Sequence, residues 1–268
     1  MAKLEAISSP ANPLLKDVRK AIARGGLTEQ GFCVAETFHL LEEALRSDCA
    51  VKVILAARSV QSAVETHVRR LANMRVIIVP DAIFESIAGT ESSQGVMALV
   101  APPTWTLEQL FRGRSLVVVL DGVQDPGNAG TIARAAEAFG ATGVLFVKGT
   151  ASPFNSKTLR ASAGSLFRIP FVHGIDAELA RAALKQNKLD VYAGVPLNSH
   201  NGAQSLVNVD LTRKCALIIG SEGRGVSDDL RAGAIDLAIP TVGVESLNAA
   251  MAASVILYEA RRQRSLRS

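Results

Sequence analysis

The sequence predicts an α/β protein whose larger, C-terminal part is a mainly parallel sheet covered by helices on both faces. Two observations predict this fold. From residue 105 onward, short β-branched runs alternate with helix-like segments, which is typical of parallel sheets. Three of these runs also open into loops rich in glycine and asparagine, and such strand ends are where open α/β sheets hold ligands.

A pair of prolines divides the chain into two predicted domains. Pro102 and Pro103 interrupt regular structure, because proline blocks both helix and ladder hydrogen bonds. We therefore predict an N-terminal domain over residues 1–104 and a second domain over residues 105–268. A length of 268 residues fits two modest domains.

The first hundred residues predict a small α/β domain of their own. Apolar residues at helical spacing, such as Leu14, Leu15 and Val18, mark its helices. The predicted helices cover residues 13–23, 37–47 and 60–73, and the predicted strands cover residues 51–56, 75–79 and 95–100.

The remainder repeats the order strand, helix, strand. Its predicted strands are residues 116–120, 143–147, 190–195, 216–219 and 237–239. Its predicted helices are residues 130–139, 177–187 and 247–264. The last helix is apolar on nearly every side, so we expect it to be buried in a core or in a subunit interface.

Composition narrows the class of protein. No apolar run approaches the roughly 20 residues of a membrane span, and residues 1–6 show no secretion signal, so we expect a soluble cytoplasmic protein. The three cysteines, Cys33, Cys49 and Cys215, are widely spaced and odd in number, which argues against a disulfide framework. The four histidines have no metal-ligand spacing, so no metal is expected.

The net charge of +4 has two open interpretations. Residues 1–104 carry 11 basic and 11 acidic side chains, so the excess lies in the second domain. Four arginines at the C-terminus, Arg261, Arg262, Arg264 and Arg267, equal this excess. A basic tail of this kind is able to meet phosphate, but cations also stabilise the end of a helix.

The first glycine loop, residues 121–130, reads DGVQDPGNAG. Pro-Gly is a turn signal, and Asn128 is placed either to cap the following helix or to serve a site. Arg134 lies on that helix about 200° from the core residue Ile132, so we expect it to point away from the core.

The second and third loops, IGSEGRG over residues 219–225 and IPTVGVESLN over residues 239–248, follow two later strands. The second loop fits neither the dinucleotide-binding fingerprint nor the P-loop, which disfavours a nicotinamide oxidoreductase and a P-loop enzyme. Its glycines would still let backbone amides approach a flat ligand. In the third loop, Ser246 is a candidate N-cap of the final helix.

Residues 155–165, NSKTLRASAGS, combine Lys157 and Arg160 with several hydroxyls. Phosphate oxygens are commonly bound by that mixture, although an ordinary polar helix start has the same composition.

Taken together and in this order, the three loops resemble the three motifs of the SpoU (TrmH-like) family of RNA ribose 2′-O-methyltransferases, in the SPOUT superfamily. Residues 160–170 and 92–98 also resemble this family. The resemblance implies a deep trefoil knot that binds S-adenosyl-L-methionine and a homodimer formed through the final helix. It further implies that the N-terminal domain resembles a small ribosomal-protein-like RNA-binding domain.

The resemblance also implies site residues. Its catalytic set falls on Asn128, Arg134, Glu222, Ser246 and Asn248. Cofactor contacts fall on Ile219, Gly220, Gly225, Ile239, Ser246 and Leu247, and RNA contacts on Lys157, Arg160, Ser162 and Arg168. Because arginine is a poor base, we assign Arg134 to phosphate binding and to stabilising the developing alkoxide, with Ser246 and Asn248 orienting Arg134 or the ribose.

Two departures from the family pattern are visible. Residues 240–248 are one residue shorter than usual, and residues 32–37, FCVAET, lack the usual Glu-Gly pair. The expected reaction is 2′-O-methylation of large-subunit ribosomal RNA (rRNA). The alternatives are transfer RNA (tRNA) as substrate, or a non-catalytic RNA-binding or ribosome-assembly protein on the same fold.

Overall fold

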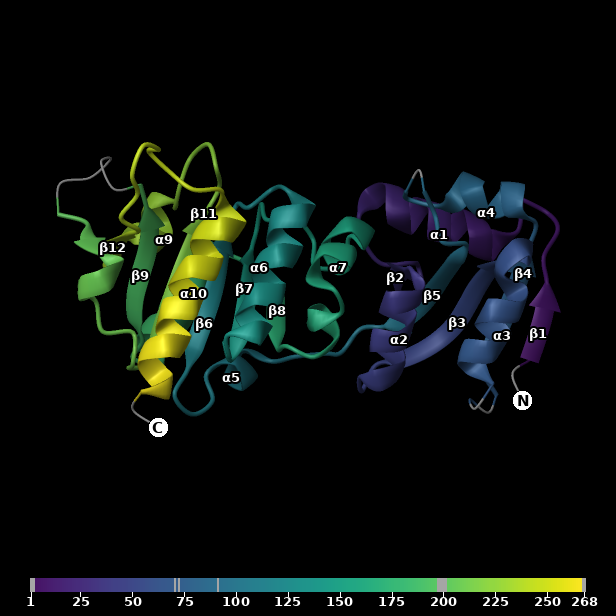
Figure 1. Cartoon of the computed structure of the whole chain (residues 1–268), viewed down its shortest axis with the longest axis horizontal. Helices are drawn as coiled ribbons and strands as arrows, with labels where there is room; N and C mark the ends of the chain where they lie inside the picture. Colours follow the sequence, from purple (N-terminus) through teal and green to yellow (C-terminus); the bar gives the residue numbers. More distant parts are fainter. Residues whose placement is uncertain (1–2, 70, 72, 91, 197–201, 267–268) are drawn as a thin grey trace. The chain divides into compact units, whose positions relative to one another are not determined.

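Two separate sheets organise the chain, each with its own helices (Figure 1). The computed structural model describes residues 3–69, 71, 73–90, 92–196 and 202–266. It divides into a first unit, Met1–Thr104 with Ser152–Arg168, and a second unit, Trp105–Ala151 with Ile169–Ser268. One division thus falls directly after the two prolines. Residues 152–168, which the sequence analysis placed in the second domain, fold with the first unit.

The first unit contains a five-stranded sheet in the order β1-β4-β3-β5-β2. Its strands are β1 (Lys3–Ala6), β2 (Cys33–Glu36), β3 (Ala50–Ala57), β4 (Arg75–Val79) and β5 (Val96–Ala101). Its helices are α1 (Pro13–Arg24), α2 (Phe38–Arg46), α3 (Gln61–Val68), α4 (Asp81–Ile87) and α7 (Ser156–Ser162), with 3-10 turns η1 (Arg58–Val60) and η2 (Ser165–Phe167). Helices α1 and α4 pack Leu15, Val18 and Phe84 into a core with strand residues such as Leu55.

Thr37 shows the structural meaning of one departure from the family pattern. It stands where the resemblance expects glycine, and its φ of 120° lies in the half of conformational space that favours glycine. Its hydroxyl accepts a hydrogen bond from the Leu40 N–H (3.2 Å) and so caps α2. The residue therefore provides a helix cap in a backbone conformation unfavourable to a β-branched side chain.

The second unit contains a seven-stranded sheet in the order β10-β12-β9-β11-β6-β7-β8. Its strands are β6 (Leu116–Asp121), β7 (Gly143–Val147), β8 (Phe171–Ile175), β9 (Asp190–Val195), β10 (Gln204–Ser205), β11 (Cys215–Gly220) and β12 (Ile235–Ala238). All the strand pairings of this sheet among the described residues are parallel, which agrees with the predicted α/β class.

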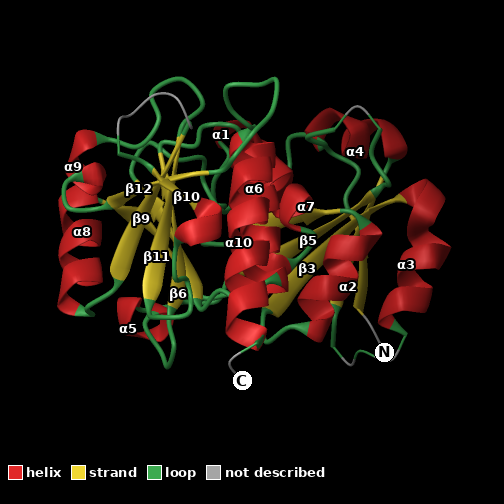
Figure 2. Ribbon diagram, turned by 60° about the vertical axis from the view of Figure 1, so that its left-hand side comes forward, coloured by secondary structure: helices red, strands yellow, loops and turns green. Residues whose placement is uncertain are grey.

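Helices cover both faces of the second sheet. They are α5 (Leu107–Leu110), α6 (Pro126–Ala138), α8 (Ala177–Gln186), α9 (Asp228–Arg231) and α10 (Ala249–Ser265), with a 3-10 turn η3 (Leu206–Asn208). Figure 2 shows α8 and α9 on one side of the sheet and α6 and α10 together on the other. On the first of these sides, Leu184 and Leu230 are buried against strand residues such as Val119.

The two helices beside the loops begin at residues other than those predicted. Helix α6 starts at Pro126, and the Asp125 carboxylate accepts the Asn128 N–H (2.7 Å), so Asp125 rather than Asn128 caps it. Helix α10 starts at Ala249, and the Asn248 side chain accepts the Ala250 and Met251 N–H groups, so Asn248 rather than Ser246 caps it. Both asparagines therefore lie at helix N-termini beside the loops.

Among the described residues, no helix combines the length and the apolarity that membrane spanning requires.

Candidate active site

A cavity of about 590 Å³ opens where β9, β11 and β12 end. Its size is typical of small-molecule pockets, and it lies outside the carboxyl ends of parallel strands, where open sheets bind ligands. The six residues expected to hold the cofactor all line it: Ile219, Gly220, Gly225, Ile239, Ser246 and Leu247. Their assigned role remains a prediction, but the structure brings them to one place.

The loop after β11 closes on itself. The Ser221 N–H donates to the Gly225 carbonyl (3.1 Å) and the Gly225 N–H donates to the Ser221 carbonyl (2.9 Å). Gly220 lies so close under this closure that an added Cβ would fall 2.1 Å from the Gly225 carbonyl carbon. At Gly225 (φ +69°) the same test meets open space, which leaves the backbone approachable from the cavity. Glycine is therefore required at Gly220 because there is no space for a side chain, and it is favoured at Gly225 because φ is positive.

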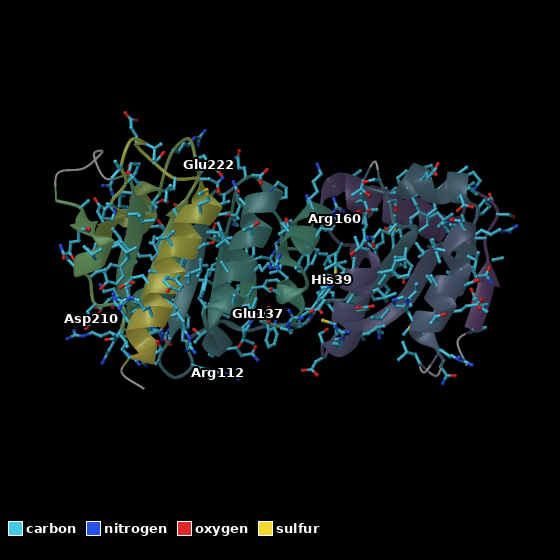
Figure 3. The ribbon with its side chains drawn as sticks, in the orientation of Figure 1. His39, Arg112, Glu137, Arg160, Asp210 and Glu222 are labelled. Carbon is cyan, nitrogen blue, oxygen red and sulfur yellow. The ribbon has the colours of Figure 1, made fainter. Side chains whose placement is uncertain are left out.

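Three side chains from three different loops form one hydrogen-bonded cluster. The Asn128 amide donates to the Glu222 carboxylate, and the Asn248 amide donates to the Asn128 side-chain oxygen (3.2 Å). Figure 3 shows Glu222 on the loop that follows β11. Because Glu222 and Asn248 also line the cavity, the cluster stands at its wall. Residues 120 positions apart in the sequence thus meet as the motif order predicted.

Buried polar groups fix the first loop where it leaves β6. The Thr150 hydroxyl donates to the Leu120 carbonyl (2.8 Å) and accepts the Gly122 N–H (3.0 Å), and the Ala151 N–H donates to the Val123 carbonyl (2.9 Å). The buried Asp121 carboxylate accepts the Ser227 N–H (2.7 Å) from the segment after the second loop. The loop that leads to Asn128 is therefore tied to two other segments of the chain.

Arg134 and Ser246 are exposed, and neither joins the cluster. Arg134 lies on α6 six residues after Asn128, about 9 Å further along the axis. Within the described residues, neither Ser246 nor Asn248 hydrogen-bonds to Arg134, so the expected orientation of Arg134 by these two side chains is not seen; Asn248 holds Asn128 instead. The outward direction predicted for Arg134 is confirmed by its exposure.

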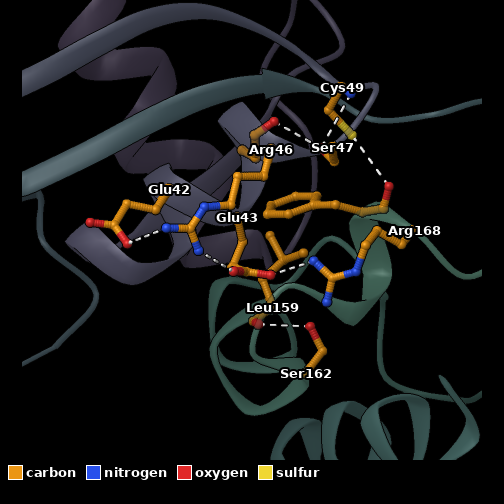
Figure 4. A network of polar contacts seen from close by, with 10 residues as sticks. Glu42, Glu43, Arg46, Ser47, Cys49, Leu159, Ser162 and Arg168 are labelled. Atoms are coloured by element: carbon orange, nitrogen blue, oxygen red, sulfur yellow. Dashed lines mark hydrogen bonds and ion pairs between the residues drawn. The ribbon is translucent and has the colours of Figure 1, made fainter. Parts of the chain in front are cut away.

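The four expected RNA contacts all lie in the first unit, and they differ in accessibility. Lys157 is exposed, but Arg160 forms an ion pair with Glu36 and Arg168 with Glu43 (Figure 4 shows the second pair). Ser162 is fully buried and its hydroxyl donates to the Leu159 carbonyl (2.8 Å). The RNA contact expected of Ser162 is therefore wrong for this structure, because RNA cannot reach a buried hydroxyl.

Sequence reasoning missed part of the cavity wall. Gly194, Val195 and Pro196 line it at the end of β9, and Arg231 lines it from α9. Arg231 donates to Asp236 (2.8 Å), and this hydrogen bond raises the pKa of Arg231 above its ordinary value. The signal for the first three was available, because the predicted strand over residues 190–195 ends at the same sheet edge as the other loops. Arg231 gave no signal, since its helix has only four residues.

The thiols and histidines supply no further chemistry to this site. Burial raises the pKa of Cys33 to about 12 and that of Cys215 to about 11, so both thiols stay protonated and unreactive. Cys49 is only partly buried. Across the described part of the chain no cluster of three His, Cys, Asp or Glu side chains is arranged to hold a metal. His200 lies outside the described residues.

Comparisons with known protein families also divide the chain into two parts, but residues 152–168, which fold with the first unit, fall within the second match. Residues 115–258 match the SpoU rRNA Methylase family, and residues 12–98 match the MRM3-like substrate binding domain.

Individual relatives match almost the whole chain. The chain is 35% identical to the Bacillus subtilis 23S rRNA (guanosine(2553)-2′-O)-methyltransferase RlmP, over 96% of this chain and 100% of the relative. Among solved structures, it resembles an AdoMet-bound rRNA methyltransferase from Sinorhizobium meliloti (TM-score 0.81, 28% identity, covering 97% and 98% of the two chains). It also resembles the SpoU methyltransferase AviRb from Streptomyces viridochromogenes (TM-score 0.82, 26% identity, covering 95% and 98%).

Proposed function

The chain belongs to the SpoU rRNA methylase family and is an S-adenosyl-L-methionine-dependent RNA ribose 2′-O-methyltransferase, and from this premise we propose that its substrate is large-subunit rRNA and that the cavity and the Asn128–Glu222–Asn248 cluster form its active site.

The observation that carries the site assignment is the cluster itself. The Asn128 side chain is hydrogen-bonded to Glu222 and Asn248, which come from the second and third loops and line the cavity. A constellation held by helix caps and reciprocal hydrogen bonds is preorganised, which is how a site keeps reacting groups aligned. The family motifs thus converge in space, as a shared site requires.

The lining of the cavity fits S-adenosylmethionine. Open backbone at Gly225 suits a flat adenine, and the carboxylates of Glu222 and Glu245 suit a cationic ligand. Arg224 in the same lining suits its carboxylate. When bound, the cofactor supplies a methyl group activated by a sulfonium. Ile219, Gly220, Ile239, Ser246 and Leu247 would hold it from the cavity wall.

The protein must prepare a ribose 2′-hydroxyl to receive that methyl group. With the cofactor bound, transfer of its methyl group would require this hydroxyl to lose its proton. Arginine, with a pKa above about 12, cannot accept it. We assign Arg134 to binding the adjacent RNA phosphate and stabilising the negative charge that develops on the 2′-oxygen, while a phosphate oxygen accepts the proton. Asn128, held by Glu222 and Asn248, would orient the ribose.

Three features of this assembly remain part of the proposal. We propose a trefoil knot around the cavity, supported by the strand order, which inserts β11 between β9 and β6. We propose that the first unit binds RNA, supported by its match to a substrate-binding domain. We propose a homodimer through α10, supported by an apolar stripe of Met251, Val255 and Tyr258 that stays exposed in the single chain.

Methyl transfer to isolated RNA tests the proposal. Purified protein with methyl-labelled S-adenosylmethionine is expected to label large-subunit rRNA at a ribose 2′-oxygen and to leave tRNA unlabelled. Arg134→Ala should lower kcat about 100-fold or more at unchanged cofactor affinity, because electrostatic stabilisation of developing charge is worth that much. Arg134→Lys, which keeps the charge, is the matched control and should recover part of the rate.

Other outcomes separate the alternatives. Labelling of tRNA alone would make tRNA the substrate. Cofactor binding without labelling of any RNA would favour the non-catalytic RNA-binding protein. An Arg134→Ala variant with the wild-type rate would overturn the role assigned to Arg134.

A further inference from the structure

Residues 152–168 follow the first loop in the sequence but are built into the other unit. We infer that Arg160 and Arg168 are positioning residues: they anchor this linker on the substrate-binding unit and thereby tie that unit to the loop that carries Asn128. This inference rests on the proposed function, because it concerns where RNA is held relative to the active site.

The first anchor is a buried ion pair. The Glu36 side chain at the end of β2 is 4% exposed, and Arg160 from α7, 21% exposed, donates to one of its oxygens. The other oxygen accepts the Gly89 N–H (2.8 Å). A charge removed from water requires a partner, so Glu36 and Arg160 depend on each other. Arg160 is therefore engaged by protein rather than free for phosphate.

The second anchor lies at the far end of the linker. Arg168 pairs with Glu43 of α2, and the same carboxylate accepts from Arg46 (3.4 Å) (Figure 4). Beside it, the Cys49 thiol donates to the Phe167 carbonyl (3.7 Å). The middle and the C-terminal end of the segment are thus held by acidic side chains of the first unit.

Glycines allow close approach between the linker and the rest of the first unit at three points. An added Cβ at Gly25 would fall 2.5 Å from Asn155 Nδ2, and one at Gly89 would fall 3.3 Å from Ser156 Oγ. One at Gly164 would fall 2.6 Å from Glu43 Cβ. Contacts this close, spread over the length of the segment, indicate a docked element rather than a passing connection.

The anchored segment begins one residue after the hydrogen bonds that shape the first loop. Ala151 donates to the Val123 carbonyl, and the Thr150 hydroxyl donates to the Leu120 carbonyl and accepts from the Gly122 N–H. Ser152, the next residue, already belongs to the first unit. A shift of the anchored segment therefore pulls directly on the segment that leads to Asn128, which gives Arg160 and Arg168 an influence on catalysis without contact to RNA.

The test compares Arg160→Gln and Arg168→Gln with Lys157→Gln. Lys157 is the matched control, because it lies on α7 together with Arg160 but its side chain is exposed. Four quantities are measured for each full-length variant: amide exchange in α7, cofactor affinity by calorimetry, rRNA affinity, and the methyl-transfer rate at saturating rRNA. Arg168→Gln guards against misfolding, because its pair is more exposed than that of Arg160 (38% against 21% for the arginine side chains).

The two arginine variants should exchange α7 amides faster, because seven residues do not form a stable helix alone. Their rate at saturating rRNA should fall roughly 10- to 100-fold, the effect of a small displacement of reacting groups, with cofactor affinity unchanged. Arg160→Lys, which keeps the charge beside Glu36, should recover part of that rate. Lys157→Gln should weaken rRNA binding without loosening α7.

Two results would overturn the inference alone. One is weaker rRNA binding by Arg160→Gln and Arg168→Gln with α7 exchange unchanged, which would make them RNA contacts. The other is a loosened α7 with a wild-type transfer rate. A wild-type protein that methylates no RNA would instead remove the proposed function, and this inference with it.

Discussion

At the scale of single residues, the site depends on positions that have no space for a side chain. Gly220 is the clearest case, because its missing side chain lets the backbone of Gly225 close over it. Nothing in the glycine-rich sequence separates Gly220 from Gly223, yet an added Cβ at Gly223 meets nothing within 4 Å. The structure therefore divides the loop into a glycine that is required and one that is not.

Gly220→Ala is expected to displace the loop and weaken S-adenosylmethionine binding at least tenfold, because the new Cβ collides with backbone rather than with a movable side chain. Calorimetric titration checks this. Gly223→Ala, in the same loop, should bind the cofactor as the wild type does. Equal affinities for both variants would show that the loop adapts.

The buried thiol of Cys33 predicts a loss of stability in alkali. Its folded pKa of about 12 exceeds the ordinary value of 9.0, so above about pH 9 only the unfolded thiol ionises and the free energy of unfolding falls. Between pH 8 and pH 10 this one group lowers the stability by about 1.4 kcal/mol. Urea unfolding at both pH values should show a smaller decrease for Cys33→Ala than for the wild type, and parallel decreases would contradict the prediction.

At the scale of elements, helix starts place the two asparagines of the proposed site. Asn248 caps helix α10: its side-chain oxygen accepts two helix N–H groups, while its amide donates to the Asn128 side chain. One residue thus performs capping and site assembly together. For Asn128 and Ser246, helix capping and a role in the site were alternative predictions. In the structure, Asn248 performs both.

Asn248→Ala should lower stability by about 1 kcal/mol through loss of the cap and should also slow methyl transfer, because Asn128 loses its support. Asn12→Ala is the control, since Asn12 caps α1 in the first unit with a hydrogen bond to Leu14 N–H (2.9 Å). It should cost similar stability and leave transfer at saturating rRNA unchanged. If Asn248→Ala and Asn12→Ala transferred methyl groups at equal rates, the proposed support of Asn128 by Asn248 would be contradicted.

The elements predicted well from sequence are those with strong apolar patterns. The strands β7 and β9 have the predicted bounds, and α1 and α8 agree to within one residue. The helix predicted over residues 60–73 is shorter, because a 3-10 turn precedes α3 and the helix ends at Val68. Short elements such as β2 and α9 were missed, since four residues carry no readable period.

The candidate site was predicted in a similarly selective way. Glycine loops at strand ends revealed which residues share the cavity, because parallel strands end at the same sheet edge. The partners of Arg160 and Arg168 were not predictable, since Glu36 and Glu43 lie more than a hundred positions away and pair with them only through the tertiary fold.

At the scale of the whole molecule, one exposed apolar stripe calls for a partner. Met251, Val255 and Tyr258 recur at helical spacing on α10 and are 58%, 40% and 57% exposed. Exposed apolar residues in a contiguous patch mark interaction sites. Together with the proposed dimer, this predicts where the two copies meet.

Met251→Glu is expected to convert the dimer to a monomer, because it places a charge in an apolar interface. Light scattering coupled to size-exclusion chromatography measures the mass directly. Leu179→Glu is the matched control, since Leu179 on α8 is equally exposed (60%) but lies on the other side of the sheet. If Leu179→Glu dissociated the dimer and Met251→Glu did not, the interface would lie on α8 instead of α10.

The interleaving of the two units limits how this protein can be rearranged, in the laboratory or in evolution. A first unit that ended at Thr104 would be exchangeable as one continuous piece, but here it is completed by seventeen residues from beyond the first glycine loop. A chimera joined at position 104 would set a foreign surface against this chain's Arg160 and Arg168. Successful grafts must therefore transfer residues 152–168 together with the N-terminal unit, and the two pieces are expected to have been inherited as one.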